Sequence, residues 1–171
     1  MTNTIFPAKK TPTLKLQVEF FRDIHDEVVA LGQQQFEEVE KRYRRHDCKP
    51  DLPTYFAHEQ AGSFILFTAR DSESNTLLGH MTFWLLTSMH MKGVLEATED
   101  FLYVVPDSRG KGIFSSLYKY AEDSLRSLGV KYIGMSSKAP VGAPDSGSLL
   151  EKHGFQRVAV YYSKQLTRSE G

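Results

Sequence analysis

The 171-residue sequence predicts a single domain of the α/β (α+β) class. The main observation is an apolar run that passes through a glycine-rich turn into an amphipathic helix, over residues 101–128. A second is a pair of strand-like segments, residues 63–69 and 77–87, which predicts a hairpin. No internal repeat or composition break indicates a second domain, so we expect a flexible N-terminal arm over residues 1–12 and one domain over residues 13–168.

The first half of the domain is expected to supply one strand and a helical region before the hairpin. Residues 14–18 alternate between apolar and polar and predict a strand. Apolar residues at helical spacing predict helix over residues 20–43, and their phase changes near Gly32, which favours two helices or one bent helix. The segment 51–62 reads as a connection that could border a substrate pocket.

The second half contains the central strand and the elements that follow it. The apolar patterns predict a strand over 94–105, a helix over 113–128 ended by Gly129, a strand over 131–135, a short helix over 148–153 and a closing strand over 156–166.

The composition excludes several classes of protein. The chain has 21 basic and 21 acidic residues, so its net charge favours neither nucleic acid nor an anionic membrane as a partner. No segment resembles a signal peptide or a membrane span, and the single cysteine, Cys48, cannot form an internal disulfide. We therefore expect a cytoplasmic protein. The six histidines lack metal-ligand spacing, so we predict no metal.

The glycine-rich turn has the chemistry of an anion-binding loop. Gly110 and Gly112 allow the backbone to approach a ligand, and the first turn of the next helix has amides without intrahelical partners. Those amides and the helix dipole favour phosphate, and Arg109 and Lys111 add positive charge. A pyrophosphate of the nucleotide type is the predicted ligand.

The spacing of the turn excludes two common phosphate-binding motifs. Lys111 is followed by Gly112 and Ile113 instead of Ser or Thr, so the turn is not a P-loop. Ser115 stands where a dinucleotide-binding fold has its third glycine, so that motif also fails.

The turn resembles the acyl-coenzyme A loop of the GNAT superfamily of N-acetyltransferases, whose pattern is Arg/Gln-x-x-Gly-x-Gly/Ala. Arg109 and Gly112 match it, Phe114 departs from it, and residues 102–106 have the Leu-x-Val-x-Pro spacing of the preceding strand. Residues 149–155 resemble the family's second helix and its closing Gly-Phe. The chain is also similar to short acetyltransferase-like proteins of tailed phages, which would place it in the host cytoplasm.

The resemblance implies a mixed, mostly antiparallel central sheet flanked by helices. It also implies transfer of an acetyl group from acetyl-CoA to a primary amine of a small molecule or protein, by direct attack in a ternary complex, in a monomer or homodimer. The residues expected to bind the cofactor are Leu102, Val104, Arg109, Gly110, Lys111, Gly112, Ile113 and Phe114.

Acetyl transfer to an amine needs a group that takes a proton from the attacking nitrogen. Asp100 falls where many family members place a carboxylate beside the substrate, on a strand that often carries a bulge, and it is the expected base, with Glu99 as its rival. The family's usual tyrosine is replaced by Leu150, so Tyr162, its neighbour Tyr161 or water would supply the acid. A salt bridge for Asp100 and sheet packing for the tyrosines are the structural alternatives.

Two other functions stay open. The missing tyrosine motivates a non-catalytic, CoA-binding regulatory module. The basic segment 41–46 motivates a nucleic-acid-modifying enzyme, although a solvated helix end explains that segment more simply. Nucleic acid is thus a possible partner but not the favoured one.

Overall fold

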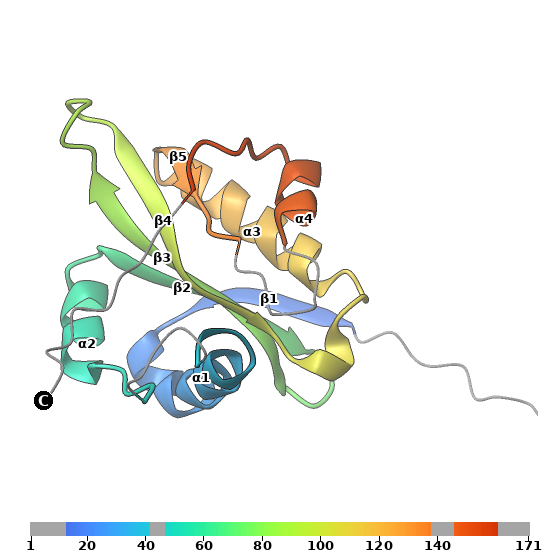
Figure 1. Ribbon diagram of the computed structural model, residues 1–171. Coiled ribbons are helices and arrows are strands. Elements are labelled where there is room, and N and C mark those ends of the chain that lie inside the picture. Colours follow the sequence, from blue (N-terminus) through green and yellow to red (C-terminus); the bar gives the residue numbers. More distant parts are fainter. Residues whose placement is uncertain (1–12, 42–46, 138–145, 161–171) are drawn as a thin grey trace, which may run out of the picture. The chain divides into compact units, whose positions relative to one another are not determined.

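The computed structural model describes residues 13–41, 47–137 and 146–160. Contacts divide the chain into two compact units, residues 1–136 and 137–171, and each is described by itself. The first unit contains a sheet of five strands (Figure 1), which are β1 (Leu14–Glu19), β2 (Phe64–Asp71), β3 (Leu77–Thr87), β4 (Leu95–Val104) and β5 (Val130–Gly134). The described part of the second unit contains one short helix, α4 (Gly147–Lys152).

The strands follow one another in sequence order across the sheet. The pairs from β1 to β4 are antiparallel, and β5 joins β4 in parallel after the intervening helix. The prediction of a mixed, mostly antiparallel sheet flanked by helices is confirmed.

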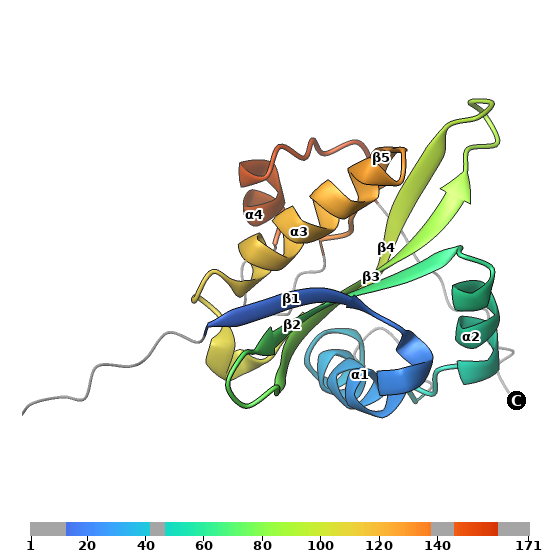
Figure 2. The same ribbon diagram turned by 180° about the vertical axis from the view of Figure 1, so that it is seen from behind.

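Helices cover both faces of this sheet. On one face lie α1 (Phe21–Gln35), which continues as the π-helical turn η1 (Phe36–Glu40), and α2 (Leu52–Gln60), whereas α3 (Ile113–Ser127) covers the other face (Figures 1 and 2). The predicted apolar stripe of α3 is buried from Ile113 to Leu125, as are the inward side chains of α1, but Leu128, expected in the stripe, lies after the helix and is exposed. Burial of these stripes against the sheet holds the layers together.

Two expectations about the helices need correction. Residues 51–62, expected to be a connection, contain α2, because Asp51 accepts a hydrogen bond from the amide of Thr54 (3.4 Å) and Pro53 occupies the first turn. The helical region 20–43 does not break at Gly32. Its irregularities are non-helical dihedrals at Ile24 and the change to π winding after α1.

The expected closing strand over 156–166 is not found in its described part, because residues 156–160 belong to no strand. The remainder, including Tyr161 and Tyr162, lies outside the described residues, so the proposed role of Tyr162 stays a prediction. The basic residues 42–46 also lie outside them.

Candidate active site

The strand β4, expected to be central, lies between β3 and the edge strand β5, and it carries a bulge that displays a carboxylate. Met81 pairs with Leu102 and Phe83 pairs with Glu99, so Asp100 and Phe101 together stand opposite Thr82 alone. The Thr82 hydroxyl accepts a hydrogen bond from the Phe101 amide (3.0 Å) and contacts the carbonyl oxygen of the same residue (3.4 Å). A threonine side chain thus replaces the ladder bond that the extra residue interrupts.

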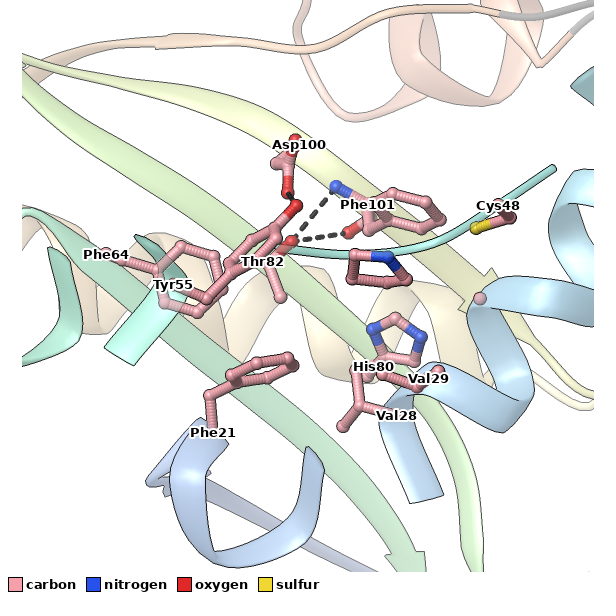
Figure 3. Close-up of a pocket in the computed structure, with 12 residues that line it drawn as sticks. Phe21, Val28, Val29, Cys48, Tyr55, Phe64, His80, Thr82, Asp100 and Phe101 are labelled. Carbon is pink, nitrogen blue, oxygen red and sulfur yellow. Dashed lines mark hydrogen bonds between the residues drawn. The ribbon is translucent and has the colours of Figure 1, made fainter. Parts of the chain in front are cut away.

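A pocket lies on the α1 and α2 side of the bulge (Figure 3), with about 350 Å³ of empty space when the solvent at its open mouth is included. Its walls are mainly apolar and come from α1, α2, β2 and the strands at the bulge. Representative lining residues are Phe21, Val28, Tyr55, Phe64, His80 and Asp100. A largely apolar pocket with a few convergent polar groups is the usual form of a small-molecule site.

Asp100, on β4, is hydrogen-bonded by a residue of α2. The Tyr55 hydroxyl donates to Asp100 Oδ2 at 2.8 Å, and the Tyr55 ring stacks on Trp84 with centroids 5.3 Å apart. Burial raises the pKa of Tyr55, and the adjacent carboxylate raises it further, so the phenol stays a donor at neutral pH. Tyr55 belongs to the segment 51–62 that was expected to border a substrate pocket, and it does line one. Its contact with Asp100 was not predicted, although the Asp-x-Pro start of α2 was a usable signal for the helix that carries it.

His80 lies on β3 at the same pocket and is fully buried. Neither of its ring nitrogens has a hydrogen-bond partner among the described residues. Burial lowers the pKa of His80 to about 4, so the ring is neutral near pH 7. Unpaired buried nitrogens are rare in proteins, which marks this ring for attention.

Glu99, the rival base, is placed elsewhere. Its Oε2 atom accepts hydrogen bonds from the amide (3.1 Å) and hydroxyl (2.8 Å) of Ser136, just after β5, and it does not line the pocket. Of the two neighbouring carboxylates, the structure brings only Asp100 to the pocket.

The strands β4 and β5 separate beyond the bulge. Their pairing ends where Thr98 meets Gly134, while β4 continues to Val104. Because Val105 donates to Leu78 O on β3, the alternation of an antiparallel ladder turns the amides of Leu102 and Val104 toward the β5 side. These amides, both in the predicted cofactor set, therefore face the side on which β5 no longer pairs with β4.

The loop between β4 and α3 has the backbone geometry of an anion site. Gly110 (φ 74°) and Gly112 (φ 76°) are both left-handed, a conformation that glycine adopts without strain. The first intrahelical bond runs from Ser116 N to Gly112 O, so the amides before it point out of the helix end. Ile113 is buried by its side chain, and the Phe114 ring stacks along the helix on Tyr118, at 6.1 Å between centroids. The side chains of Ile113 and Phe114 therefore pack against the helix and the core and not over the glycine loop.

The guanidinium of Arg109 is held by groups of the protein itself. Its Nε donates to Val104 O and its Nη2 to Glu38 Oε2, both at 2.8 Å, and it lies 5.1 Å from the Tyr103 ring centre. Tyr103 also donates to Glu38 at 2.7 Å. Burial acts to raise the pKa of Glu38, but these hydrogen bonds and the positive charge lower it on balance. Arg109 thereby links the loop to η1.

A bulged strand that separates from its parallel neighbour and leads through a glycine loop into a helix N-terminus is the arrangement that the resemblance to the acetyltransferases predicted. The family comparison agrees, because the model of the acetyltransferase (GNAT) family matches residues 26–155. The chain therefore belongs to the GNAT family, whose members are acetyltransferases that use acetyl-CoA.

Solved structures share the fold. They include an aminoglycoside acetyltransferase from an uncultured soil metagenomic sample (16% identity, TM-score 0.68, 90% of this chain and 97% of that one). Glucosamine-6-phosphate N-acetyltransferase from Arabidopsis thaliana is 12% identical (TM-score 0.65, 91% and 99%). A predicted acetyltransferase with acetyl-CoA from Clostridium acetobutylicum is 14% identical (TM-score 0.64, 90% and 96%). No curated protein sequence matches this chain.

Within residues 13–41, 47–137 and 146–160, no group of three or more His, Cys, Asp or Glu side chains could hold a metal ion. No helix in this described part is long and apolar enough to cross a bilayer.

Proposed function

We propose that this protein transfers the acetyl group of acetyl-CoA to a primary amine, with a small molecule as the first choice of acceptor and a protein amine as the second. The observation that supports this most is the position of Asp100 at the β4 bulge, where an apolar pocket and the cofactor loop share one strand. The names of two similar structures, an aminoglycoside and a glucosamine-6-phosphate acetyltransferase, favour a small acceptor.

The reaction needs little covalent chemistry from the protein. An alkylammonium has a pKa of about 10, so it must lose a proton before it attacks, and Asp100 takes that proton directly or through water. The amine nitrogen then forms a bond to the thioester carbonyl carbon, the carbon–sulfur bond breaks, and the CoA thiolate leaves and is protonated. The amide of Leu102 faces the open side of β4 and is our candidate donor to the developing oxyanion.

The pyrophosphate of CoA is expected at the start of α3. The amides of residues 110–114 and the helix dipole would bind it, with Lys111 adding charge. Arg109 would contribute mainly by holding the loop, because its guanidinium is occupied by Glu38 and Val104 O. Phe114 is compatible with pyrophosphate binding in this arrangement, because its ring stacks on Tyr118 along the helix.

The test is thiol release from acetyl-CoA with a panel of amines, comparing Asp100→Asn with Glu99→Gln. We expect Asp100→Asn to lower kcat by about 10²- to 10⁴-fold while CoA binding is kept, because only the proton acceptor is lost. Glu99→Gln, on the neighbouring residue that contacts Ser136, should keep most of the activity. Full activity of Asp100→Asn would refute the assigned base, and absence of release with every amine would refute the proposed transfer.

A further inference from the structure

Resting on the proposed function, we infer that the acceptor is an amphiphilic monoamine. Its ammonium end binds at Asp100, an apolar body of about one aromatic ring fills the pocket, and a hydroxyl or N–H group at the far end pairs with His80. Neither the family nor the similar structures assign this class of substrate to the chain.

The charge of the pocket favours one amine over several. Among the described residues that line it, Asp100 is the only carboxylate, and the remaining walls are largely apolar. One ammonium group can pair with Asp100, but further ammonium groups of a polyamine or aminoglycoside would be buried without a partner. Such burial is costly, so polycations are disfavoured.

The aromatic walls favour a flat apolar body. Phe21, Tyr55 and Phe64 line the pocket and contact one another at centroid distances of 5.1 to 5.8 Å. Phe101 closes the pocket from β4, where a methyl group added at Gly32 would already touch its ring at 3.5 Å. A substrate ring in this setting gains from both apolar burial and ring–ring contact.

The unpaired ring of His80 is the reason why we expect a polar group at the far end of the substrate. A neutral imidazole offers one donor and one acceptor, so a single hydroxyl can pair with either nitrogen. Buried polar groups nearly always have hydrogen-bond partners, and His80, which has none among the described residues, lines the pocket itself. The ring is closed off from solvent, so substrate binding requires the side chains at this end of the pocket to move apart.

The two polar side chains enter the pocket at separate places. His80 stands two residues before Thr82 on the same face of β3, and Thr82 faces the bulge that carries Asp100. Two residues of strand span about 7 Å. Figure 3 shows Asp100 and His80 entering the pocket region at separate places, with the side chain of Phe101 nearby. A phenyl ring with a two-carbon amine arm and a para hydroxyl carries the three groups in this order: an amine, a flat apolar body and a distal hydroxyl.

The experiment uses tyramine and phenethylamine, which differ only in the phenolic hydroxyl, with spermidine as the polycation. Each is titrated by calorimetry into the full chain saturated with CoA. We expect tyramine to bind about tenfold more tightly than phenethylamine, the effect of one hydrogen bond to a buried group, and spermidine to bind most weakly. In His80→Phe the two aromatic amines should bind within about twofold of each other.

The control variant is His58→Phe, on α2, where the exposed ring contacts Trp84 and Ser63 outside the lining of the pocket. It should keep the preference for tyramine. Should His80→Phe fail to fold, the comparison of the two amines in the wild-type protein still decides the question.

Three results would overturn the inference. The first is tighter binding of spermidine than of tyramine, and the second is a preference for tyramine that survives in His80→Phe. The third is turnover of octanoyl-CoA as fast as acetyl-CoA while no aromatic amine binds, which would make the pocket a site for the acyl chain. A parallel thiol-release assay separates the two proposals. Bound tyramine without release would refute acetyl transfer alone, whereas release with spermidine and no binding of tyramine would refute this inference alone.

Discussion

Replacement of Arg70 with leucine is expected to remove much of the stability of the domain. Arg70 is 3% exposed, and its guanidinium joins three elements. Nε donates to Glu19 Oε2 of β1 at 2.8 Å, Nη1 and Nη2 donate to Glu27 of α1 at 2.8 and 3.0 Å, and Nη1 also reaches Asn75 O at 3.0 Å. These bonds tie β1, α1 and the β2–β3 turn to one side chain.

The magnitude follows from which carboxylate is left unpaired. The side chain of Glu27 is 48% exposed, so water can replace Arg70 there at little cost. The side chain of Glu19 is only 17% exposed and would keep the Thr68 hydroxyl as a partner, so the loss should approach that of a broken buried ion pair, about 3–5 kcal/mol. Domains of this kind are stable by about 5–15 kcal/mol, so Arg70→Leu should lose a large part of the total.

The assay is urea unfolding at pH 7 followed by circular dichroism, with Arg126→Leu as the matched control. Arg126 makes the same kind of ion pair, with Glu122 on the exposed side of α3, and its side chain is 69% exposed. The control should lose at most about 0.5 kcal/mol. Adding Glu19→Gln to Arg70→Leu should recover part of the loss, because it removes the unpaired charge. A loss below about 1 kcal/mol in Arg70→Leu, or one equal to that of the control, would refute the reasoning.

The other predictions concern acid and two glycines. Burial acts to raise the pKa of Glu19, but hydrogen bonds from Arg70 and others lower it on balance. The ionised Glu19 therefore stabilises the folded protein above the unfolded pKa of about 4.3, and this contribution is lost as the pH falls through the lower pKa of the folded state. Between pH 5 and 3 the urea midpoint of the wild type should therefore fall more than that of Arg70→Leu, and parallel falls would contradict this. Gly79→Ala should cost about 1–3 kcal/mol, because the new Cβ would lie 2.9 Å from Tyr103 O. Gly32→Ala, inside α1 and without such a clash, should instead gain about 0.5–1 kcal/mol, and equal urea midpoints for the two variants would contradict both.

The sheet and the loop could be predicted because their signals are local. Alternating apolar residues indicate strands, and Gly110 and Gly112 indicate a turn whatever the rest of the chain does. Helix α2 was missed because its apolar residues form no clear stripe. The local signal that could have identified it is the cap at Asp51 with Pro53 in the first turn. No residue of α2 is buried, so the helix has no apolar face that could identify it in the sequence.

The candidate site was predictable only in part. The charged residues of β4 stood out because a carboxylate in a buried strand is costly, and the family resemblance then pointed to Asp100 among them. Its contact with Tyr55 joins residues 45 positions apart, and the unpaired state of His80 depends on everything that surrounds it. Such relations arise from tertiary packing, which no local spacing encodes.

Arg109 illustrates why the charge of a side chain near a glycine loop does not define its role. Its charge is balanced by Glu38, which is held ionised by Arg109 and by the Tyr103 hydroxyl. Glu38 belongs to η1, and a π turn changes which side chains of the helix face the sheet. The π winding therefore helps to place Glu38 beside Arg109, and Arg109 in turn holds the start of the loop that follows β4. We expect the attraction of the loop for pyrophosphate to come from backbone amides and Lys111, while Glu38 ties η1 to Arg109 at the start of the loop.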